Sequence, residues 1–386
     1  MDSDKPHIIL DIGSDSVKAG FAGEDGPRVI FPCIVGRPKI PGIMVGFNPR
    51  DYFIGKETIE KRGVLILRKP VVHGTVVDWE DIEHILDYIF NYELRIDPSE
   101  HNVLVTVHPK KPTSDNENIS QRHQREKWIS ILFETFNVPN VALVNSAECT
   151  LHAYGYTSGI VVDSGDEVTN IVPIIDGHVL TNLTKNIELA GRDLTNHMRS
   201  LLTEQDLHFS SYSEMETLKE IKEQTCYVAL NFQQELNDSA QGMAKTMDYT
   251  MPEGNIITIG NARFRTAEIL FKPALYGKEY YGIHGQIHEL ITKADAKLWH
   301  QLGQHIVLSG GNTLFPGFLE RLEAELKYIL PMTVAQDMTI VTMPGMEYAA
   351  WMGGASLSNT EAFSERWVTT EEYMDNGPAI IHEKYI

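Results

Sequence analysis

Residues 7–23 read HIILDIGSDSVKAGFAG, and residues 159–177 read GIVVDSGDEVTNIVPIIDG. In each stretch an apolar run ends at an aspartate, a short turn with glycine and serine follows, and a second apolar run begins. This order of features is typical of a β-hairpin. The expected strands are 8–10 and 17–21 in the first stretch and 160–162 and 168–175 in the second. Because the two hairpins lie about 150 residues apart, they predict two similar lobes that face each other.

Length and composition agree with two lobes. The 386 residues are 42 % hydrophobic and 22 % charged, which is typical of a folded globular protein. A chain of this length is too long for one compact core of ordinary size. Its formal net charge of −20 disfavours binding along a nucleic-acid backbone and suits cations or basic protein surfaces.

The beginning of the chain, MDSDKPHIIL, lacks the basic region and apolar stretch of a signal peptide. No run approaches the roughly 20 apolar residues that a membrane span needs. The three cysteines, Cys33, Cys149 and Cys226, are too few and too widely spaced for a disulfide framework or a zinc site. We therefore expect reduced thiols and a cytosolic or nuclear protein.

Both hairpin turns carry side chains that suit a phosphate site. Glycine lets the backbone approach a phosphate closely, Ser14 can donate to phosphate oxygens, and Lys18 supplies a positive charge. Asp11, Asp163 and Asp166 would hold a hydrated divalent cation on the phosphate tail. The alternative is two unrelated hairpins whose aspartates cap turns, and either hairpin alone would favour that interpretation. The repetition favours a site.

Two further patterns lie downstream. The stretch IVLSGGNTLFPG (306–317) is an apolar strand that enters a Gly-Gly turn, and helical spacing follows over 318–330. Such a turn lets a flat nucleobase lie against the backbone. Residues 217–230 also have helical spacing, and Lys222 and Glu223 lie off the apolar stripe. The pattern alone predicts that these two form a solvated charge pair.

The chain resembles actin along nearly its whole length. Several long segments match in register, which is far more specific than a single glycine motif. The matching segments, in order, are VKAGFAGEDGPRVIFPCIVGRPK (17–39), FETFNVPN (133–140), VVDSGDEVTNIVPIIDG (161–177), ELAGRDLT (188–195), IKEQTCYVAL (221–230), ITIGNARFR (257–265), VLSGGNTLFPG (307–317) and NGPAIIHEKYI (376–386).

The resemblance implies the two-lobed α/β fold that actin shares with sugar kinases and heat-shock chaperones. In this fold each lobe contains a five-stranded mixed sheet flanked by helices, and a nucleotide with its divalent cation lies in the cleft between the lobes. The implied subdomains are residues 1–32, 70–153 and 349–386 for subdomain 1, 33–69 for subdomain 2, 154–189 and 279–348 for subdomain 3, and 190–278 for subdomain 4.

The resemblance also implies site residues for ATP or ADP with Mg²⁺ or Ca²⁺. It places the phosphates near Gly13, Ser14, Lys18, Gly165 and Asp166, and the cation near Asp11, Asp163 and Asp166. It places the adenosine against Gly191, Lys219, Lys222, Glu223, Gly311, Asn312, Leu314 and Phe315. For Lys222 and Glu223 this replaces the solvated pair that the pattern alone predicts.

The resemblance implies partner-binding loops as well. The segment IPGIMVG (40–46) matches the actin loop that docks into the next filament subunit, and the apolar tip of Ile43, Met44 and Val45 is useful only against a partner. His73 stands where actin has the histidine near its phosphate-sensing loop. The segment LYGK (275–278) matches a loop that packs between filament strands. Here Lys278 and Tyr281 change its character and Glu383 makes the tail less basic, so filament formation of the ordinary two-stranded kind is left open.

The chain departs from actin where the chemistry is expected. Asp15 and Glu167 replace glycines of the two phosphate turns, and Glu347 replaces a lysine near the adenine. Ser146 and Asn170 replace the glutamine and histidine that position the hydrolytic water. A carboxylate about 4 Å from a phosphate costs about 4 kcal/mol at an effective dielectric near 20, and losing one water-positioning group slows a reaction about 10²- to 10³-fold. The alternative for Asp15 and Glu167 is that both face solvent and leave nucleotide binding intact.

Relative to actin, the chain has an insertion of about nine residues within PTSDNENISQR (112–122). The segment is polar and rich in asparagine and serine, which predicts a surface loop.

These features predict an actin-related structural or regulatory subunit of a cytoskeletal assembly, which hydrolyses ATP poorly or not at all. Its partners would be proteins: actin-type subunits, a cytoskeletal complex or further copies of itself. We expect the cytoplasmic cytoskeleton as its location, with the nucleus as the alternative. The first alternative function is a polymerising ATPase, which pelleting in polymerising salt would reveal. The second is a nuclear subunit of a chromatin-remodelling complex, which the absence of a basic localisation cluster disfavours; a sugar kinase fits least.

Overall fold

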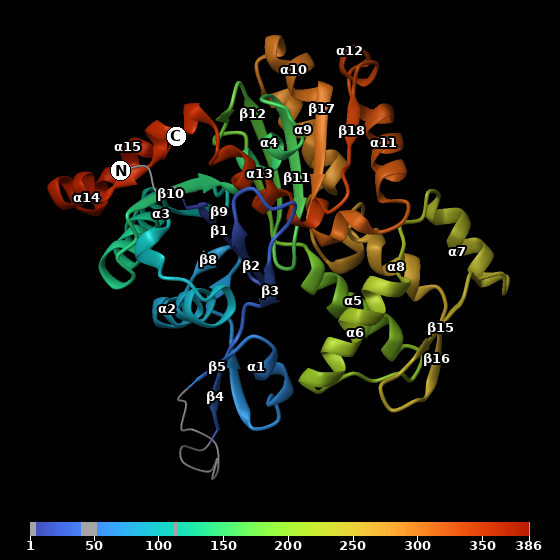
Figure 1. Cartoon of the computed structure of the whole chain (residues 1–386). Helices are drawn as coiled ribbons and strands as arrows, with labels where there is room; N and C mark the ends of the chain where they lie inside the picture. The colour runs from blue at the N-terminus through green and yellow to red at the C-terminus, as the bar shows by residue number, and fades with distance from the viewer. Residues whose placement is uncertain (1–4, 40–51, 112–113, 386) are drawn as a thin grey trace. The chain divides into compact units, whose positions relative to one another are not determined.

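The computed structural model describes residues 5–39, 52–111 and 114–385 (Figure 1). Within these residues the chain forms two compact units. The first unit consists of the described residues of Met1–Ser158, Ile174–Asn182 and Met343–Ile386, and the second of Gly159–Pro173 and Leu183–Thr342. The prediction of two lobes is confirmed by this division.

The first unit is built on a mixed sheet with strand order β19-β10-β9-β1-β2-β3. The strand β1 pairs antiparallel with β2 and parallel with β9, so the predicted first hairpin is confirmed. The strands are β1 (Ile8–Ile12), β2 (Ser16–Phe21), β3 (Val29–Pro32), β9 (Val103–Val107), β10 (Asn140–Asn145) and β19 (Val368–Thr369).

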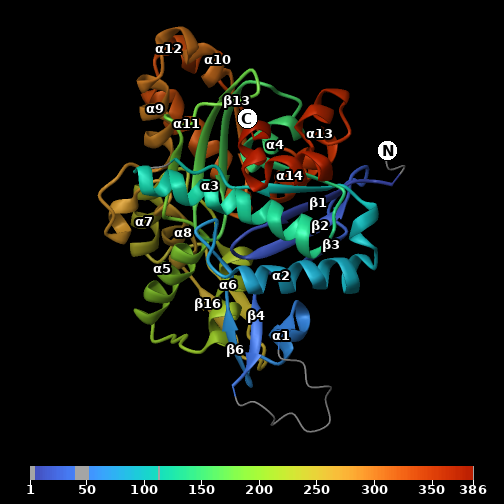
Figure 2. The same ribbon diagram turned by 90° about the vertical axis from the view of Figure 1, so that its left-hand side faces the viewer.

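Helices cover both faces of this sheet (Figure 2). Because successive side chains of a strand point to opposite faces, the neighbours Ile8 and Ile9 join different buried clusters. The cluster around Ile8 contains side chains from α2 (Trp79–Asp87) and the end of α3 (Asp115–Ser130). The cluster around Ile9 contains side chains from α4 (Ser146–Ala153) and α13 (Ala349–Leu357).

Smaller elements complete the first unit. A three-stranded sheet has the order β5-β4-β6, and β7 pairs with β8. These elements are β4 (Val35–Pro38), β5 (Phe53–Ile54), α1 (Lys56–Glu60), β6 (Leu65–Arg68), β7 (Val71–Val72), β8 (Thr75–Val76), η1 (Tyr88–Leu94), η2 (Pro98–Glu100), η3 (Ile131–Thr135), η7 (Met346–Tyr348), η8 (Glu361–Arg366), α14 (Thr370–Asn376), η9 (Pro378–Ile380) and α15 (Ile381–Lys384).

A second sheet has the strand order β13-β12-β11-β17-β18, with β14 also paired to β12. Its strands are β11 (Gly159–Ser164), β12 (Thr169–Ile175), β13 (His178–Val179), β14 (Lys185–Ile187), β17 (His305–Ser309) and β18 (Thr339–Val341). The predicted strands over 160–162 and 168–175 are confirmed to within two residues. Among the described residues each large sheet has six strands rather than the expected five, because β13, β14 and β19 are short strands that extend the pairing.

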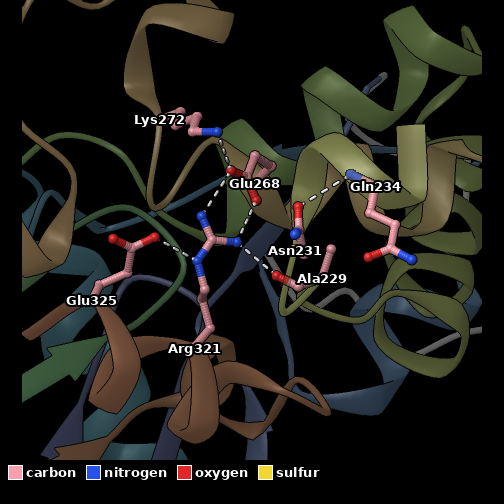
Figure 3. A network of polar contacts seen from close by, with 7 residues as sticks. All are labelled: Ala229, Asn231, Gln234, Glu268, Lys272, Arg321 and Glu325. Atoms are coloured by element: carbon pink, nitrogen blue, oxygen red, sulfur yellow. Dashed lines mark hydrogen bonds and ion pairs between the residues drawn. The ribbon is translucent and has the colours of Figure 1, made fainter. Parts of the chain in front are cut away.

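The second unit also contains a group of packed helices and the hairpin β15-β16. A buried ion pair between Arg321 and Glu268 joins α11 to α8 inside this unit (Figure 3). The remaining elements are α5 (Gly191–Thr203), α6 (Tyr212–Thr225), α7 (Phe232–Ala240), β15 (Met247–Thr250), β16 (Ile256–Ile259), α8 (Ala262–Glu268), η4 (Pro273–Tyr276), α9 (Ile283–Lys293), η5 (Ala296–Leu298), α10 (Trp299–Gln304), η6 (Gly311–Leu314), α11 (Phe318–Ile329) and α12 (Met332–Ala335).

The insertion is helical where the structure describes it. Residues 115–122 form the first half of α3, so the prediction of a loop is wrong for them. The Ser114 hydroxyl accepts a hydrogen bond from the amide of Glu117 at 3.3 Å and caps the helix. The same helix continues to the buried Trp128 and Ile129, and this burial outweighs the weak helix propensity of the polar residues.

The helix predicted over 217–230 begins and ends about five residues earlier, as α6. Ser211 and Glu214 form a capping box that sets the start. The helix ends before Cys226, whose backbone is extended. The helix predicted over 318–330 is confirmed as α11.

Candidate functional site

The first hairpin places its charged residues opposite each other. Asp11 on β1 pairs in register with Lys18 on β2, and the Lys18 ammonium lies 3.0 Å from Oδ2 of Asp11. The turn between the strands is closed by the amide of Gly13, which donates to the carbonyl of Ser16 at 3.0 Å. Four of the predicted residues, Asp11, Gly13, Ser14 and Lys18, therefore share one hairpin.

The carboxylate of Asp11 is buried and strongly hydrogen bonded. The hydroxyl of Thr106 on β9 donates to Oδ1 of Asp11 at 2.6 Å. Burial raises the pKa of Asp11, but Lys18, Thr106 and the nearby His108 together lower it by more than burial raises it. The pKa of Asp11 therefore lies below its usual value. Asp11 therefore stays ionised, as a cation-binding carboxylate must.

Ser14 is tied to the short turn between β7 and β8. Its hydroxyl accepts a hydrogen bond from the amide of Gly74 at 3.3 Å. His73 and Gly74 both have positive φ, 47° and 69°, as a two-residue hairpin turn of this kind requires. A Cβ on Gly74 would lie 2.8 Å from the His108 ring, so this position has room only for glycine. The turn at His73 and Gly74 therefore lies next to Ser14 and His108 within the first unit.

Three departures from actin also lie in the first unit. Asp15 is half-buried, and its carbonyl accepts from the amide of Cys33 at 2.9 Å. Ser146 is buried and is the first residue of α4, directly after the capping residue Asn145. Glu347 is half-buried in η7.

The second hairpin repeats the geometry of the first. The amide of Gly165 donates to the carbonyl of Val168 at 3.1 Å, which matches the bond that closes the first turn. Asp163 on β11 is in register with Ser309 on β17, just as Asp11 is with Thr106 in the other sheet. The repeat predicted from the sequence is thus confirmed down to the turn hydrogen bond.

Three predicted residues hold the second turn in place. The side-chain amide of Asn312 donates to the carbonyl of Gly165 at 2.6 Å, and the backbone amide of Gly191 donates to the same carbonyl at 3.0 Å. The buried ammonium of Lys222 donates to the carbonyl of Gly191 at 3.1 Å. Burial lowers the pKa of Lys222, which the carboxylate of Glu223 opposes. A solvated Lys222, predicted from the pattern alone, is therefore wrong, whereas Glu223 is exposed.

Glu167 is turned into the interior of the second unit. Its side chain is 1 % exposed and forms an ion pair with Arg192, whose Nη2 also lies 3.5 Å from Oδ2 of Asp166. The alternative that Glu167 faces solvent is therefore wrong. Asp15, for which the same alternative was given, is half-buried.

Asn170 is also engaged inside the second unit. It lies on β12, is 2 % exposed, and pairs in register with Asn186 on β14. The side-chain amide of Asn186 donates to Oδ1 of Asn170 at 2.7 Å. The oxygen of Asn170 is therefore used in a cross-strand contact.

Some of the predicted residues do not take part in the contacts described above for the two hairpins. Ile43, Met44 and Val45 lie outside the described residues. Lys278 is half-buried, whereas Leu275, Tyr281 and Glu383 are exposed. Among the predicted adenosine residues, Lys219 lies half-buried on α6, Gly311 and Leu314 are exposed in η6, and Phe315 is buried next to η6.

Four residues that contact the two hairpins in the structure were not predicted from the sequence. They are Thr106, His108, Asn186 and Arg192. Two of the four could have been predicted from the sequence. Arg192 directly follows Gly191 in the matched segment ELAGRDLT, and Thr106 is the one hydroxyl in the apolar run of β9. Nothing local singles out His108 or Asn186.

The described residues contain neither a metal-binding cluster nor a membrane-spanning helix. No group of three or more His, Cys, Asp or Glu side chains in residues 5–39, 52–111 and 114–385 is arranged to hold a metal ion. None of the helices in this part of the chain is both long and apolar enough to cross a bilayer.

A family model described as Actin matches residues 3–386. The match covers both units and both hairpins.

Proposed function

The chain belongs to the actin family, and we propose that it is an actin-related structural or regulatory subunit of a cytoskeletal assembly, which binds ATP and hydrolyses it poorly or not at all. The proposal combines the family with the side chains found at the two positions that resemble the water-positioning residues of actin.

The contact between Asn170 and Asn186 carries the proposal. A histidine has a ring nitrogen that can accept a proton, whereas a carboxamide has none. The acceptor atom of the Asn170 side chain is its oxygen, and this oxygen already accepts a hydrogen bond from Asn186 at 2.7 Å. A water molecule next to Asn170 would therefore find no basic group there.

Ser146 supports the same conclusion. It is buried at the start of α4, and its side chain, one methylene and a hydroxyl, is shorter than the two methylenes and carboxamide of glutamine. Because catalysis by positioning depends on reach as well as on chemistry, the shorter side chain weakens the orientation of water.

The described residues fit a nucleotide with a divalent cation. Each hairpin turn opens with glycine, Lys18 supplies positive charge, and the ionised Asp11 suits a hydrated cation. When bound, ATP and its cation would supply the phosphate oxygens and the positive charge that these groups recognise. Glu167 is buried rather than exposed on the turn, so it leaves the surface of the turn accessible.

For partners we propose other proteins of actin type, further copies of this chain or a larger cytoskeletal complex, in the cytoplasm. The net charge of −20 and the exposed Leu275 and Tyr281 support protein contacts rather than nucleic-acid contacts. We also propose that the chain is divided into four subdomains, with the boundaries that the resemblance implies.

The first test identifies the nucleotide that the protein retains. Protein purified without added nucleotide is denatured, and the released nucleotide is identified by chromatography. Stoichiometric ATP is expected. ADP would contradict poor hydrolysis and favour the polymerising ATPase, which pelleting in polymerising salt would then check. An empty protein would contradict ATP binding.

The second test restores the side chains of actin. Phosphate release is measured for the unmodified protein and for the double variant Asn170→His with Ser146→Gln. The double variant is expected to release phosphate faster, and Asn237→His, at an exposed position of α7, serves as the matched control. Phosphate release by the unmodified protein at the rate of a polymerising actin measured in parallel would contradict the proposal.

A further inference from the structure

A pocket of the first unit lies outside the two hairpins. Its volume is about 670 Å³, which is within the usual range for ligand pockets. Its walls come from Tyr52, from α2 and η1, from η2 with the preceding Asp97, and from the end of η3 with the loop that follows it. All of these segments belong to the first unit, so the pocket is formed within one unit.

The pocket is negatively charged. The carboxylates of Glu83, Asp87 and Asp97 line it, whereas neither a lysine nor an arginine is found among the described residues of its lining. His84 also belongs to the lining, and its Nε2 lies 3.6 Å from Oε1 of Glu80, which does not. The lining therefore suits a positively charged group.

The fold does not use the charges of Glu83 and Asp87. These residues lie four positions apart on α2, a spacing at which like charges destabilise a helix. The half-buried carboxylate of Glu83 forms no ion pair or hydrogen bond with another described residue. Asp87 accepts from the side-chain amide of Asn91 at 2.7 Å, a bond that an asparagine at position 87 would also accept. A bound cation would offset both charges.

Asp97 is held by its own turn. Its Oδ1 accepts from the backbone amide of Ser99 at 3.0 Å and from the Ser99 hydroxyl at 2.7 Å. These hydrogen bonds lower the pKa of Asp97. Asp97 therefore presents an ionised carboxylate of fixed orientation.

Aromatic rings accompany the carboxylates. Tyr52 stacks on His84 with ring centroids 3.8 Å apart and an interplanar angle of 16°. Phe136 is half-buried and packs edge-on against Phe90 at 5.2 Å. A guanidinium is planar, so it can stack on an aromatic ring while its N–H groups donate to carboxylates. An ammonium is a compact point charge that gains less from such a surface. The lining therefore favours a guanidinium over an ammonium.

The pocket is open to a macromolecule, because Asn91, Asp97 and Asn137 of its lining are exposed. We propose that it binds an arginine side chain presented by a partner protein. The guanidinium pairs with Glu83 and Asp87 and stacks on an aromatic ring of the lining. This inference goes beyond the proposed function, and it does not depend on nucleotide binding.

The test measures the affinity of the pocket for short peptides. The probe is a fluorescently labelled, amidated peptide of sequence Gly-Arg-Gly-Arg-Gly, and fluorescence anisotropy gives its Kd at low salt. Matched peptides carry lysine or the neutral arginine analogue citrulline. The unmodified protein should bind the arginine peptide more tightly than either. In the double variant Glu83→Gln with Asp87→Asn the Kd should rise about tenfold or more, because hydrogen bonds to charged groups are lost.

The double variant Glu361→Gln with Asp375→Asn is the matched control. It removes two exposed carboxylates of the same unit, so the net charge changes equally and the Kd should stay unchanged. Thermal unfolding provides a second readout. The Glu83→Gln and Asp87→Asn variant should be at least as stable as the unmodified protein, since it lacks the like-charged pair on α2. A purely structural role of these carboxylates would instead lower the melting temperature.

Tyr52→Leu tests the aromatic wall. It should weaken binding of the arginine peptide several-fold and leave binding of the lysine peptide nearly unchanged, because stacking favours the planar guanidinium. An equal loss for both peptides would contradict the choice of a guanidinium.

Several outcomes would overturn the inference. They are no binding of the arginine peptide at millimolar concentration, equal affinity for the arginine and lysine peptides, and an equal loss of affinity in the control variant. Free arginine amide that binds as tightly as the peptide would indicate a small-molecule site and overturn the partner protein. Nucleotide retained by the same preparations is identified in parallel. Retained ATP without peptide binding would overturn this inference alone, whereas peptide binding by a protein without nucleotide would support it and contradict ATP binding.

Discussion

Arg321 and Glu268 meet inside the second unit through two parallel hydrogen bonds, each 3.1 Å long (Figure 3). Both side chains are buried. Arg321 also donates to the carbonyl of Ala229 at 2.6 Å and to Glu325 at 2.7 Å. The guanidinium thus connects α8, α11 and the segment that precedes α7.

Removing one partner of this pair should destabilise the second unit strongly. Arg321→Met leaves the carboxylate of Glu268 buried, with the partly exposed Lys272 at 3.3 Å as a cationic partner. We expect a loss of about 3–5 kcal/mol in the free energy of unfolding. Chemical denaturation measures the loss. Lys327→Met, which breaks an exposed ion pair with Glu323, is the control and should change stability by less than about 1 kcal/mol. Similar losses in both variants would contradict this account.

The close approach of α4 and α13 leaves no room for a methyl group at Gly353. A Cβ there would lie 1.7 Å from the carbonyl oxygen of Cys149. We expect Gly353→Ala to lower the free energy of unfolding by about 3 kcal/mol, because the helices must move apart. Gly26→Ala is the control, since a Cβ there meets nothing within 4 Å. Equal melting temperatures for the two variants would refute the prediction.

The ion pair of Asp11 and Lys18 predicts a specific response to acid. The pKa of Asp11 in the folded protein lies below its usual value of 3.8, so its ionised form stabilises the fold above that pH. This contribution is lost as the pH falls below 3.8 through the folded-state pKa. Lys18→Met removes a cation that lowers the pKa, while burial still raises it. The midpoint of acid unfolding, followed by circular dichroism, should therefore move to higher pH.

Lys5→Met is the control for this acid titration, because Lys5 forms an exposed ion pair with Glu100 in the same unit. Its midpoint should stay close to that of the unmodified protein. If both variants shifted by the same amount, the effect would come from the total charge of the protein and not from Asp11.

The helical insertion predicts a protected amide at Glu117. Ser114→Ala removes the capping hydroxyl and should cost about 1 kcal/mol of local helix stability, whereas Ser114→Asp should retain the cap. Hydrogen exchange of residues 116–120 measures this as faster exchange in the alanine variant. Exchange at the rate of an unstructured chain in the unmodified protein would show that α3 begins later.

The sequence alone was sufficient to predict the two hairpins, their aspartates and the glycine turns. These features depend on local properties, namely the alternation of apolar strands and the backbone freedom of glycine. The closing bonds from Gly13 to Ser16 and from Gly165 to Val168 span only three residues, so they follow from the local pattern. The family also followed from long matched segments, because many specific residues in register are unlike a short motif.

Only the tertiary structure decided the state of the charged and polar side chains. Glu167 could face solvent or the interior, and its pairing with Arg192, 25 residues away, follows from the docking of α5 against the turn. The engagement of Asn170 with Asn186 required β14 to lie beside β12. The burial of Lys222 required the carbonyl of Gly191 as its acceptor. In each case the partner comes from another element, and burial of a polar group is stable only when such a partner is present.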